Sequence, residues 1–92
     1  MELQFEFASY FSSMIGGREY LVTTNGKETT LGEAFGVLLE QYPDLEDTLR
    51  TKNVIVDGKV SAIFVVNGNL LQDEAALSDG NTIRVMAPIC GG

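Results

Sequence analysis

The hydrophobic pattern at the start of the chain has the period of a β-strand. Leu3, Phe5 and Phe7 alternate with polar residues, which is the spacing of a strand with one buried face. Residues 8–15 lose this alternation and end at a pair of glycines, which predicts a turn or a single helical turn. Residues 20–24 are rich in β-branched and aromatic side chains, and we expect a second strand there, antiparallel to the first.

A helical period follows the next Asn-Gly turn. Thr30 and Glu33 have the spacing of a capping box, and Pro43 cannot continue a helical ladder, so we expect a helix from about 31 to about 41. Gly36 weakens this helix by roughly 1 kcal/mol relative to alanine, and a close approach of helix to sheet is one reason to keep it. The apolar residues follow the i, i+3, i+4, i+7, i+8, i+11 spacing of one helix face, and they are Leu31, Ala34, Phe35, Leu38, Leu39 and Tyr42.

The next stretch predicts shorter elements. Leu45 and Leu49 indicate one extra helical turn under a long loop. Residues 54–60 predict a small hairpin around Asp57-Gly58, because this dipeptide favours a two-residue turn. Residues 62–66 are almost all apolar and predict a strand that is covered on both sides or central in the sheet.

The last strand is expected at residues 82–86 and ends before Pro88, which donates no ladder hydrogen bond. Ile83 and Val85 share one face, so Met86 should be exposed on the other. The elements together predict an α+β fold, with a mixed sheet of four to five strands and one main helix packed across it. The first and last strands are both candidates for the sheet centre.

The amino-acid composition excludes several classes of function. The 92 residues suffice for one domain, and 13 acids against six bases give a net charge of −7, which argues against nucleic-acid binding. With no histidine and one cysteine, the chain cannot build a Cys/His zinc site, a His-dependent triad or an internal disulfide. We expect no membrane span, because no segment approaches the ~20 apolar residues that a span needs. The N-terminus carries acids where a secretory signal carries bases, so we expect a cytoplasmic protein.

The carboxyl end is the most informative feature. Gly91 and Gly92 have no Cβ, so this end can thread a narrow channel and present the α-carboxylate of Gly92 to a partner. The alternative is an inert terminus, which is common at chain ends. We expect a globular domain over residues 1–88 and a flexible tail over residues 89–92.

Four segments carry a resemblance to a known family. They cover the opening strand, the helix end, the apolar strand with its turn, and the last strand with its tail: Phe5–Ala8, Leu38–Pro43, Phe64–Gly68 and Leu77–Gly92. In order and spacing the chain resembles the ubiquitin-like sulfur carriers of the MoaD/ThiS type, and more closely the small subunit of molybdopterin synthase. The resemblance implies a β-grasp fold. Cys90 departs from the family pattern, which usually has alanine, serine or threonine there.

The resemblance also implies a chemistry in which the chain is a substrate and not an enzyme. A ubiquitin-activating-like adenylyltransferase would consume ATP to adenylate the Gly92 carboxylate. A persulfide donor, or sulfurtransferase, would then convert it to a thiocarboxylate, which the synthase large subunit uses to deliver sulfur to the pterin precursor. No permanently bound cofactor or metal is implied.

The same resemblance implies a docking surface. Its positions are Phe7, Leu70 and Met86 on the sheet, followed by Pro88, Ile89 and Cys90 before the two glycines. For Phe7 the alternation leaves core packing open as the alternative. For Cys90 the alternatives are a small residue filling its slot and a reactive thiol that forms a mixed disulfide.

Other functions remain open on the sequence. The activated Gly92 would equally serve a ubiquitin-like modifier that acylates lysines, or a sulfur carrier for thiamin, cysteine or another thiolated metabolite. A plain interaction module with an inert tail is the remaining alternative.

Overall fold

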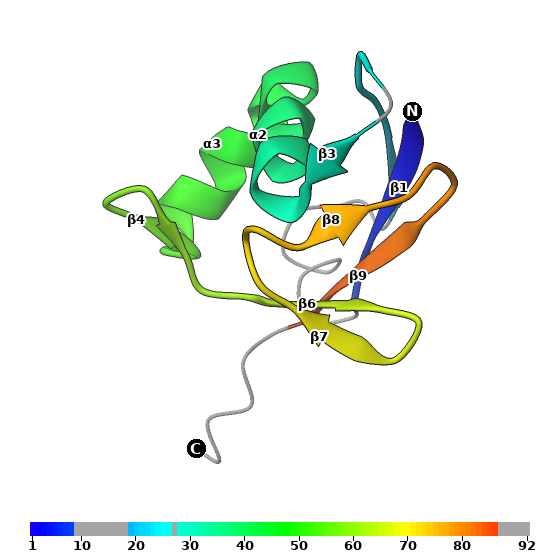
Figure 1. The fold of residues 1–92 in the computed structure, drawn as a ribbon. Helices are drawn as coiled ribbons and strands as arrows, with labels where there is room; N and C mark the ends of the chain where they lie inside the picture. The colour runs from blue at the N-terminus through cyan, green and yellow to red at the C-terminus, as the bar shows by residue number, and fades with distance from the viewer. Residues whose placement is uncertain (9–18, 27, 87–92) are drawn as a thin grey trace.

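The computed structural model describes residues 1–8, 19–26 and 28–86. Its centre is a five-stranded sheet in the order β2-β1-β9-β6-β7, with two helices on one face (Figure 1). Two short two-stranded pairs, β3 with β8 and β4 with β5, lie outside this sheet. The elements in chain order are β1 Glu2–Phe7, β2 Glu19–Thr23, β3 Thr29–Thr30, α2 Leu31–Gln41, α3 Pro43–Thr51, β4 Ile55–Val56, β5 Lys59–Val60, β6 Ile63–Val66, β7 Asn69–Leu71, β8 Ala76–Leu77 and β9 Thr82–Met86.

Strands β1 and β9 occupy the interior of the sheet, as the sequence predicts. They run parallel, with Phe5 opposite Ile83 and Phe7 opposite Val85, and β2 pairs antiparallel with β1 on the other side. The apolar residues of β1 are buried and the intervening ones face outward, because side chains alternate across a strand. The predicted turn at residues 8–15 falls largely outside the described residues.

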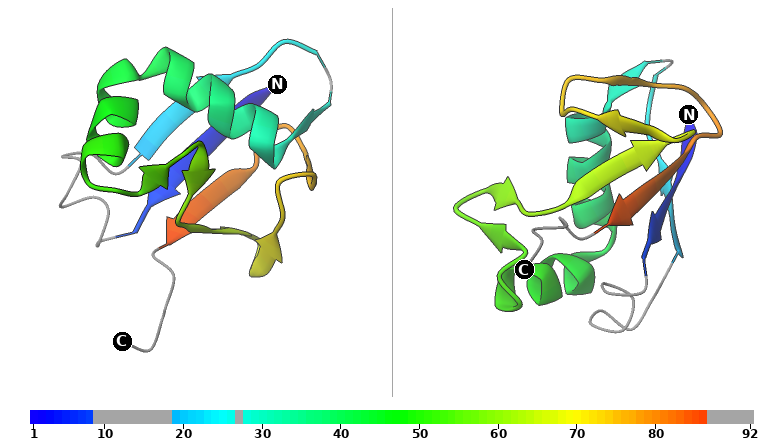
Figure 2. Two further views of the ribbon diagram at one scale, coloured as in Figure 1. Left: turned by 90° about the vertical axis from the view of Figure 1, so that its left-hand side faces the viewer. Right: turned by 90° about the horizontal axis from the view of Figure 1, so that it is seen from below.

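Helix α2 crosses one face of this sheet over the predicted span (Figure 2). The backbone amide of Glu33 donates to Thr30 Oγ1 at 3.3 Å, and the amide of Thr30 donates to Glu33 Oε1 at 3.1 Å. This capping box satisfies two amides of the first turn. The Phe35 ring lies between two others on the sheet, with its centroid 6.0 Å from Phe5 and 5.3 Å from Phe64.

The segment after α2 is more helical than predicted. Instead of one extra turn, residues Pro43–Thr51 form a nine-residue helix, α3, which packs against α2 and β4. Pro43 is at the first position of α3, where its missing N–H costs no hydrogen bond. Leu45 and Leu49 are buried, and the acidic first turn and Arg50 in the last turn complement the helix dipole.

Strand β7 was not predicted, because Leu70 and Leu71 precede polar residues and no longer alternate. The hairpin that forms β7 depends on its turn, in which Asn67 and Gly68 both have positive φ, 52° and 81°. Two consecutive positive φ values define the turn that best matches the twist of a tight hairpin. The predicted hairpin of residues 54–60 has the same turn chemistry, with φ of 53° at Asp57 and 76° at Gly58.

Gly36 has no close contact that excludes a side chain. A Cβ added there meets nothing within 4 Å, so a close approach to the sheet is not the reason for this glycine. We therefore expect Gly36→Ala to stabilise the protein by roughly 0.5–1 kcal/mol, because alanine has the higher helix propensity. Urea denaturation of the two proteins measures this, and a destabilised variant would contradict the geometry.

Neither α2 nor α3 could cross a membrane. Within the described residues, no helix reaches the length and apolar character that a span requires.

Candidate functional site

An apolar face lies on the side of the sheet opposite the helices, next to the end of β9. Met86 is directly opposite Ile63, and Leu70 is directly opposite Val65. Leu70 is 69% exposed, whereas the other three side chains are partly buried. We call these four residues the apolar face. The four side chains are neighbours on one face, and contiguous apolar surface of this kind is typical of protein interaction sites.

A charged pair borders the apolar face. Arg84 is opposite Val65 on one side and Glu6 on the other, and its Nε lies 3.2 Å from Glu6 Oε1. Both side chains are partly exposed to solvent, so the pair adds little to stability.

Phe7 does not belong to this surface. It is 1% exposed, and its ring contacts Tyr20 edge-on at a centroid distance of 5.5 Å. The prediction that Phe7 contributes to docking is therefore wrong in this structure, and the alternative of core packing holds. The reason is the alternation itself, which places Phe7 on the same face as Leu3 and Phe5 up to the last residue of β1.

Met86 is less exposed than predicted. The alternation places it on the outer face, as expected, but its neighbour Ile63 on β6 partly covers it. Ile63 and Val65 are the members of the apolar face that the sequence analysis missed, because the apolar run predicts a strand covered on both sides or central in the sheet, and either alternative leaves no distinct outer face. The register between β6 and β9 reveals them, and no local sequence signal specifies that register.

The free edge of β2 is closed by two side chains from the end of α2. Met1 and Thr24 exchange backbone hydrogen bonds of 3.0 and 2.9 Å, so the odd-numbered carbonyls of β2 point away from β1. Gln41 Nε2 donates to Thr23 O at 3.1 Å, and Tyr42 Oη donates to Leu21 O at 2.9 Å. Occupied carbonyls make this edge a poor template for another strand.

Tyr20 lies beneath this capped edge. Its ring contacts the Tyr42 ring at a centroid distance of 4.9 Å. Burial raises the pKa of Tyr20 above its usual value, and the neighbouring Tyr42 adds to the rise. The phenol of Tyr20 therefore stays neutral at physiological pH.

The remaining predicted site residues, Pro88, Ile89, Cys90, Gly91 and Gly92, lie outside the described residues. The described chain ends with β9 at Met86, so the tail begins beside the apolar face. The division into a domain of residues 1–88 and a tail of residues 89–92 stays a prediction. Among the described residues, no group of three or more Asp, Glu, His or Cys side chains is placed to hold a metal ion.

Comparison with known proteins identifies the fold. No family model and no curated protein matches the chain, but several solved structures do. Small archaeal modifier protein 1 from Haloferax volcanii superimposes with a TM-score of 0.78 at 22% identity over 100% of both chains. The Haloferax volcanii HVO 2177 protein gives a TM-score of 0.66 at 28% identity, covering 100% of this chain and 87% of its own.

A third similar structure is a complex. It contains subunits 1 and 2 of the molybdopterin-converting factor from Helicobacter pylori, and it matches with a TM-score of 0.60 at 18% identity over 100% of both chains. The chain therefore has the β-grasp fold of ubiquitin-like proteins, as the MoaD/ThiS resemblance predicts. Its solved structural neighbours include a small archaeal modifier protein and a subunit of a molybdopterin-converting factor.

Proposed function

We propose that this protein is a sulfur carrier for molybdopterin biosynthesis, working through a thiocarboxylate at Gly92. One observation supports this most: a β-grasp domain whose interior strand β9 ends at Met86, only a few residues before a Gly-Gly carboxyl end in the sequence. A rigid strand fixes where the tail begins, and the two glycines make its end narrow. Such an end serves as a substrate for another protein's active site.

The chemistry requires little from the chain itself. The Gly92 carboxylate attacks the α-phosphate of ATP in an activating enzyme and releases pyrophosphate, giving an acyl-adenylate. The terminal sulfur of a persulfide then displaces AMP, and a thiol cleaves the resulting acyl disulfide to leave the thiocarboxylate. The partners supply every catalytic group, which agrees with a chain that has no histidine and a single thiol.

The apolar face is the proposed docking site for these partners. It adjoins the end of β9, so a partner that covers it receives the tail at a fixed distance. The Helicobacter pylori complex joins subunit 1 to subunit 2, and we infer an equivalent large-subunit partner for this chain. The net charge of −7 favours partners with basic surfaces near the apolar contact.

A second function shares the same activation step. The modifier protein from Haloferax volcanii has the higher TM-score, 0.78 against 0.60 for the Helicobacter pylori complex, which supports attachment of Gly92 to lysines of other proteins as the second candidate. The two candidates differ in the nucleophile that meets the acyl-adenylate. In a sulfur carrier the nucleophile is the sulfur of a persulfide. In a modifier the acyl group is transferred to the amine of a lysine.

Intact mass spectrometry distinguishes these candidates. The purified chain is incubated with a cognate activating enzyme, ATP and a persulfide donor. A sulfur carrier gains the mass difference between one sulfur and one oxygen atom. Lysine-linked adducts in a cell extract, without that gain, would support the modifier instead.

The docking proposal makes a separate prediction. Leu70→Asp should raise the KM of the activating enzyme for the chain about tenfold, because a charge at a buried hydrophobic contact costs more than 1 kcal/mol. Leu21→Asp is the matched control, since Leu21 is 67% exposed on the opposite edge of the sheet. Steady-state kinetics with both variants measures the effect, and equal KM values would remove the apolar face from docking.

A further inference from the structure

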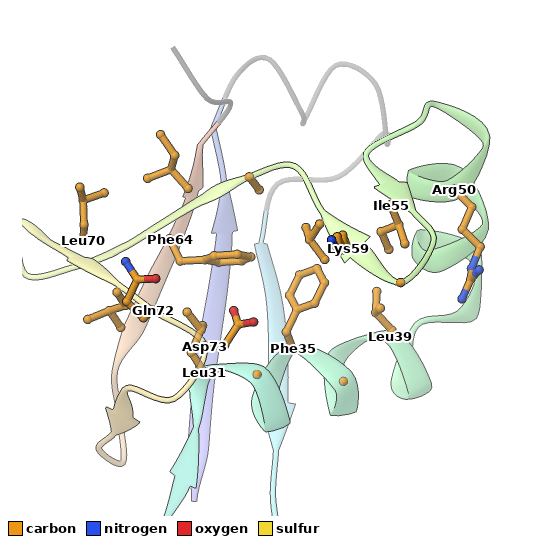
Figure 3. Close-up of a pocket in the computed structure, with 17 residues that line it drawn as sticks. Leu31, Phe35, Leu39, Arg50, Ile55, Lys59, Phe64, Leu70, Gln72 and Asp73 are labelled. Atoms are coloured by element: carbon orange, nitrogen blue, oxygen red, sulfur yellow. The ribbon is translucent and has the colours of Figure 1, made fainter. Parts of the chain in front are cut away.

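The structure contains a groove that meets the apolar face only at its rim, where Ile63 and Leu70 belong to both. It lies between α2 and the edge of the sheet, with a volume of about 630 Å³ (Figure 3). Phe35 and Leu39 of α2 form one wall, and Phe64 of β6 and Ile55 of β4 face them. This size is within the range of ligand-binding pockets.

The middle of the groove is open to an approaching backbone. Gly36 and Gly58 contribute to its lining, and a Cβ built on either one meets nothing within 4 Å. Two glycines facing a space with both apolar and polar walls leave room for an extended peptide. An extended peptide with apolar side chains would bury them against Phe35 and Ile55.

The groove also carries a positive charge that is not neutralised. Of its lining cations, Arg50 is paired with Glu46 at 3.2 Å. Lys59 lines the groove and forms no ion pair among the described residues. Asp73 is the acidic member of the lining and lies toward the N-terminal end of α2, beside Leu31, whereas Lys59 lies on the hairpin side (Figure 3). In a chain of net charge −7, an unpaired lysine in this groove favours a ligand that ends in a carboxylate.

The carboxyl end of the same chain can reach this lysine. Met86 is opposite Ile63, which places their Cα atoms about 5 Å apart. Lys59 is four residues before Ile63 along the chain, so these two lie at most about 14 Å apart. Six residues follow Met86 and span up to about 20 Å when extended, which covers the whole distance.

The chemistry of the tail matches the groove. Residues 87–90 are Ala-Pro-Ile-Cys, all without charge, and the chain ends in the α-carboxylate of Gly92. We propose that the groove is a binding site for the chain's own carboxyl-terminal segment, residues 87–92, with the Gly92 carboxylate beside the Lys59 ammonium. The groove shares Ile63 and Leu70 with the apolar face at its rim, but its floor of Phe35, Ile55 and Lys59 is distinct, and the proposal does not depend on the proposed function.

The tethered tail needs only weak intrinsic affinity. A short flexible connection gives an effective concentration in the millimolar range, so a peptide that binds with a millimolar Kd occupies the groove when it is part of the chain. A docked carboxylate is withheld from solvent and from any enzyme that modifies it. Binding of a partner to the tail then competes with the groove.

Amide spectra of the ¹⁵N-labelled chain test this directly. We compare the full chain with a chain that ends at Ala87, and we expect the amide signals of Gly36 and Gly58 to differ between them. The amide signal of Val22, on edge strand β2 at the opposite edge of the sheet, should not change. Lys59→Glu in the full chain should move both glycine signals toward their positions in the shortened chain. Lys52→Glu is the matched control, because this substitution makes the same change of charge at a lysine that does not line the groove.

A peptide of residues 87–92 added to the shortened chain should restore the shifts. The same peptide with an amidated end should bind about two- to fivefold more weakly, as expected for loss of one exposed ion pair. Gly36→Leu, which fills the groove with a good helix former, should prevent the shift of the remaining Gly58 signal. Unchanged Gly36 and Gly58 signals on truncation would overturn the proposal. Shifts that disappear on dilution would also overturn it, because they would assign the tail to a second copy.

Discussion

Deletion of Gly91 and Gly92 is expected to abolish activation of the chain. The acyl-adenylate forms at the terminal carboxylate, and without the two glycines that carboxylate is on Cys90, two residues short of the partner's reacting centre. Misplacement of a reacting group by even 1 Å can cost about a hundredfold in rate. ATP–pyrophosphate exchange by the activating enzyme measures the loss, and we expect a decrease of at least about a hundredfold.

The same deletion should leave the fold unchanged. The sheet is complete at Met86, the last residue of β9, and a change beyond it should alter the free energy of unfolding by less than about 0.5 kcal/mol. Urea denaturation of the shortened chain is therefore the control. A shortened chain that supports exchange at the full rate would contradict a role for the two glycines.

Phe5→Ala should be among the most destabilising single substitutions in the core. Phe5 is 0% exposed and is on interior strand β1, with its ring against Phe35 of α2. Truncation of a phenylalanine at such a site leaves a cavity and costs roughly 3–5 kcal/mol. Urea denaturation measures this as a lower midpoint, with the slope unchanged if unfolding remains two-state.

Phe35→Ala is the matched comparison for Phe5. Phe35 is 7% exposed and lines the groove, so the space left by its ring opens to solvent. We expect a loss of about 3 kcal/mol, at or below the loss for Phe5→Ala. A loss below about 1 kcal/mol for either variant would mean that the helix–sheet packing described here is wrong.

The sequence predicts α2 well because its signals are local. The capping residues, the apolar spacing and Pro43 all lie within one short segment, and each has a direct physical meaning. Strands β1 and β9 are predicted for the same reason, since their alternation is visible without knowledge of their partners. Their place in the sheet interior agrees with the buried apolar face that both carry.

Elements that depend on distant partners are predicted less well. Strand β7 is stabilised by pairing with β6, and its two adjacent leucines show no alternation. Helix α3 buries Leu45 and Leu49 against the rest of the core, and the apolar signal of two residues is too short to set its length. In both cases tertiary packing determines whether the element forms and how long it is, and a local sequence pattern does not encode that packing.

The candidate site shows the same division. Leu70 and Met86 were found through the family resemblance and the alternation, and the structure places them on one face with Ile63 and Val65. Those last two were missed because the register between β6 and β9 is a long-range property. The resemblance implies that Phe7 is a docking residue, whereas the alternation of β1 indicates the core. The structure agrees with the alternation.

The position of transferred sulfur tests the central claim most directly. After incubation with activating enzyme, ATP and a persulfide donor, fragmentation mass spectrometry of the carboxyl-terminal peptide locates the sulfur at Gly92 or at Cys90. We predict an exchange of one oxygen for one sulfur on the Gly92 carboxyl group, and the same exchange in the Cys90→Ala variant. Sulfur added to the Cys90 thiol, with the Gly92 carboxyl group unchanged, would contradict the proposed function.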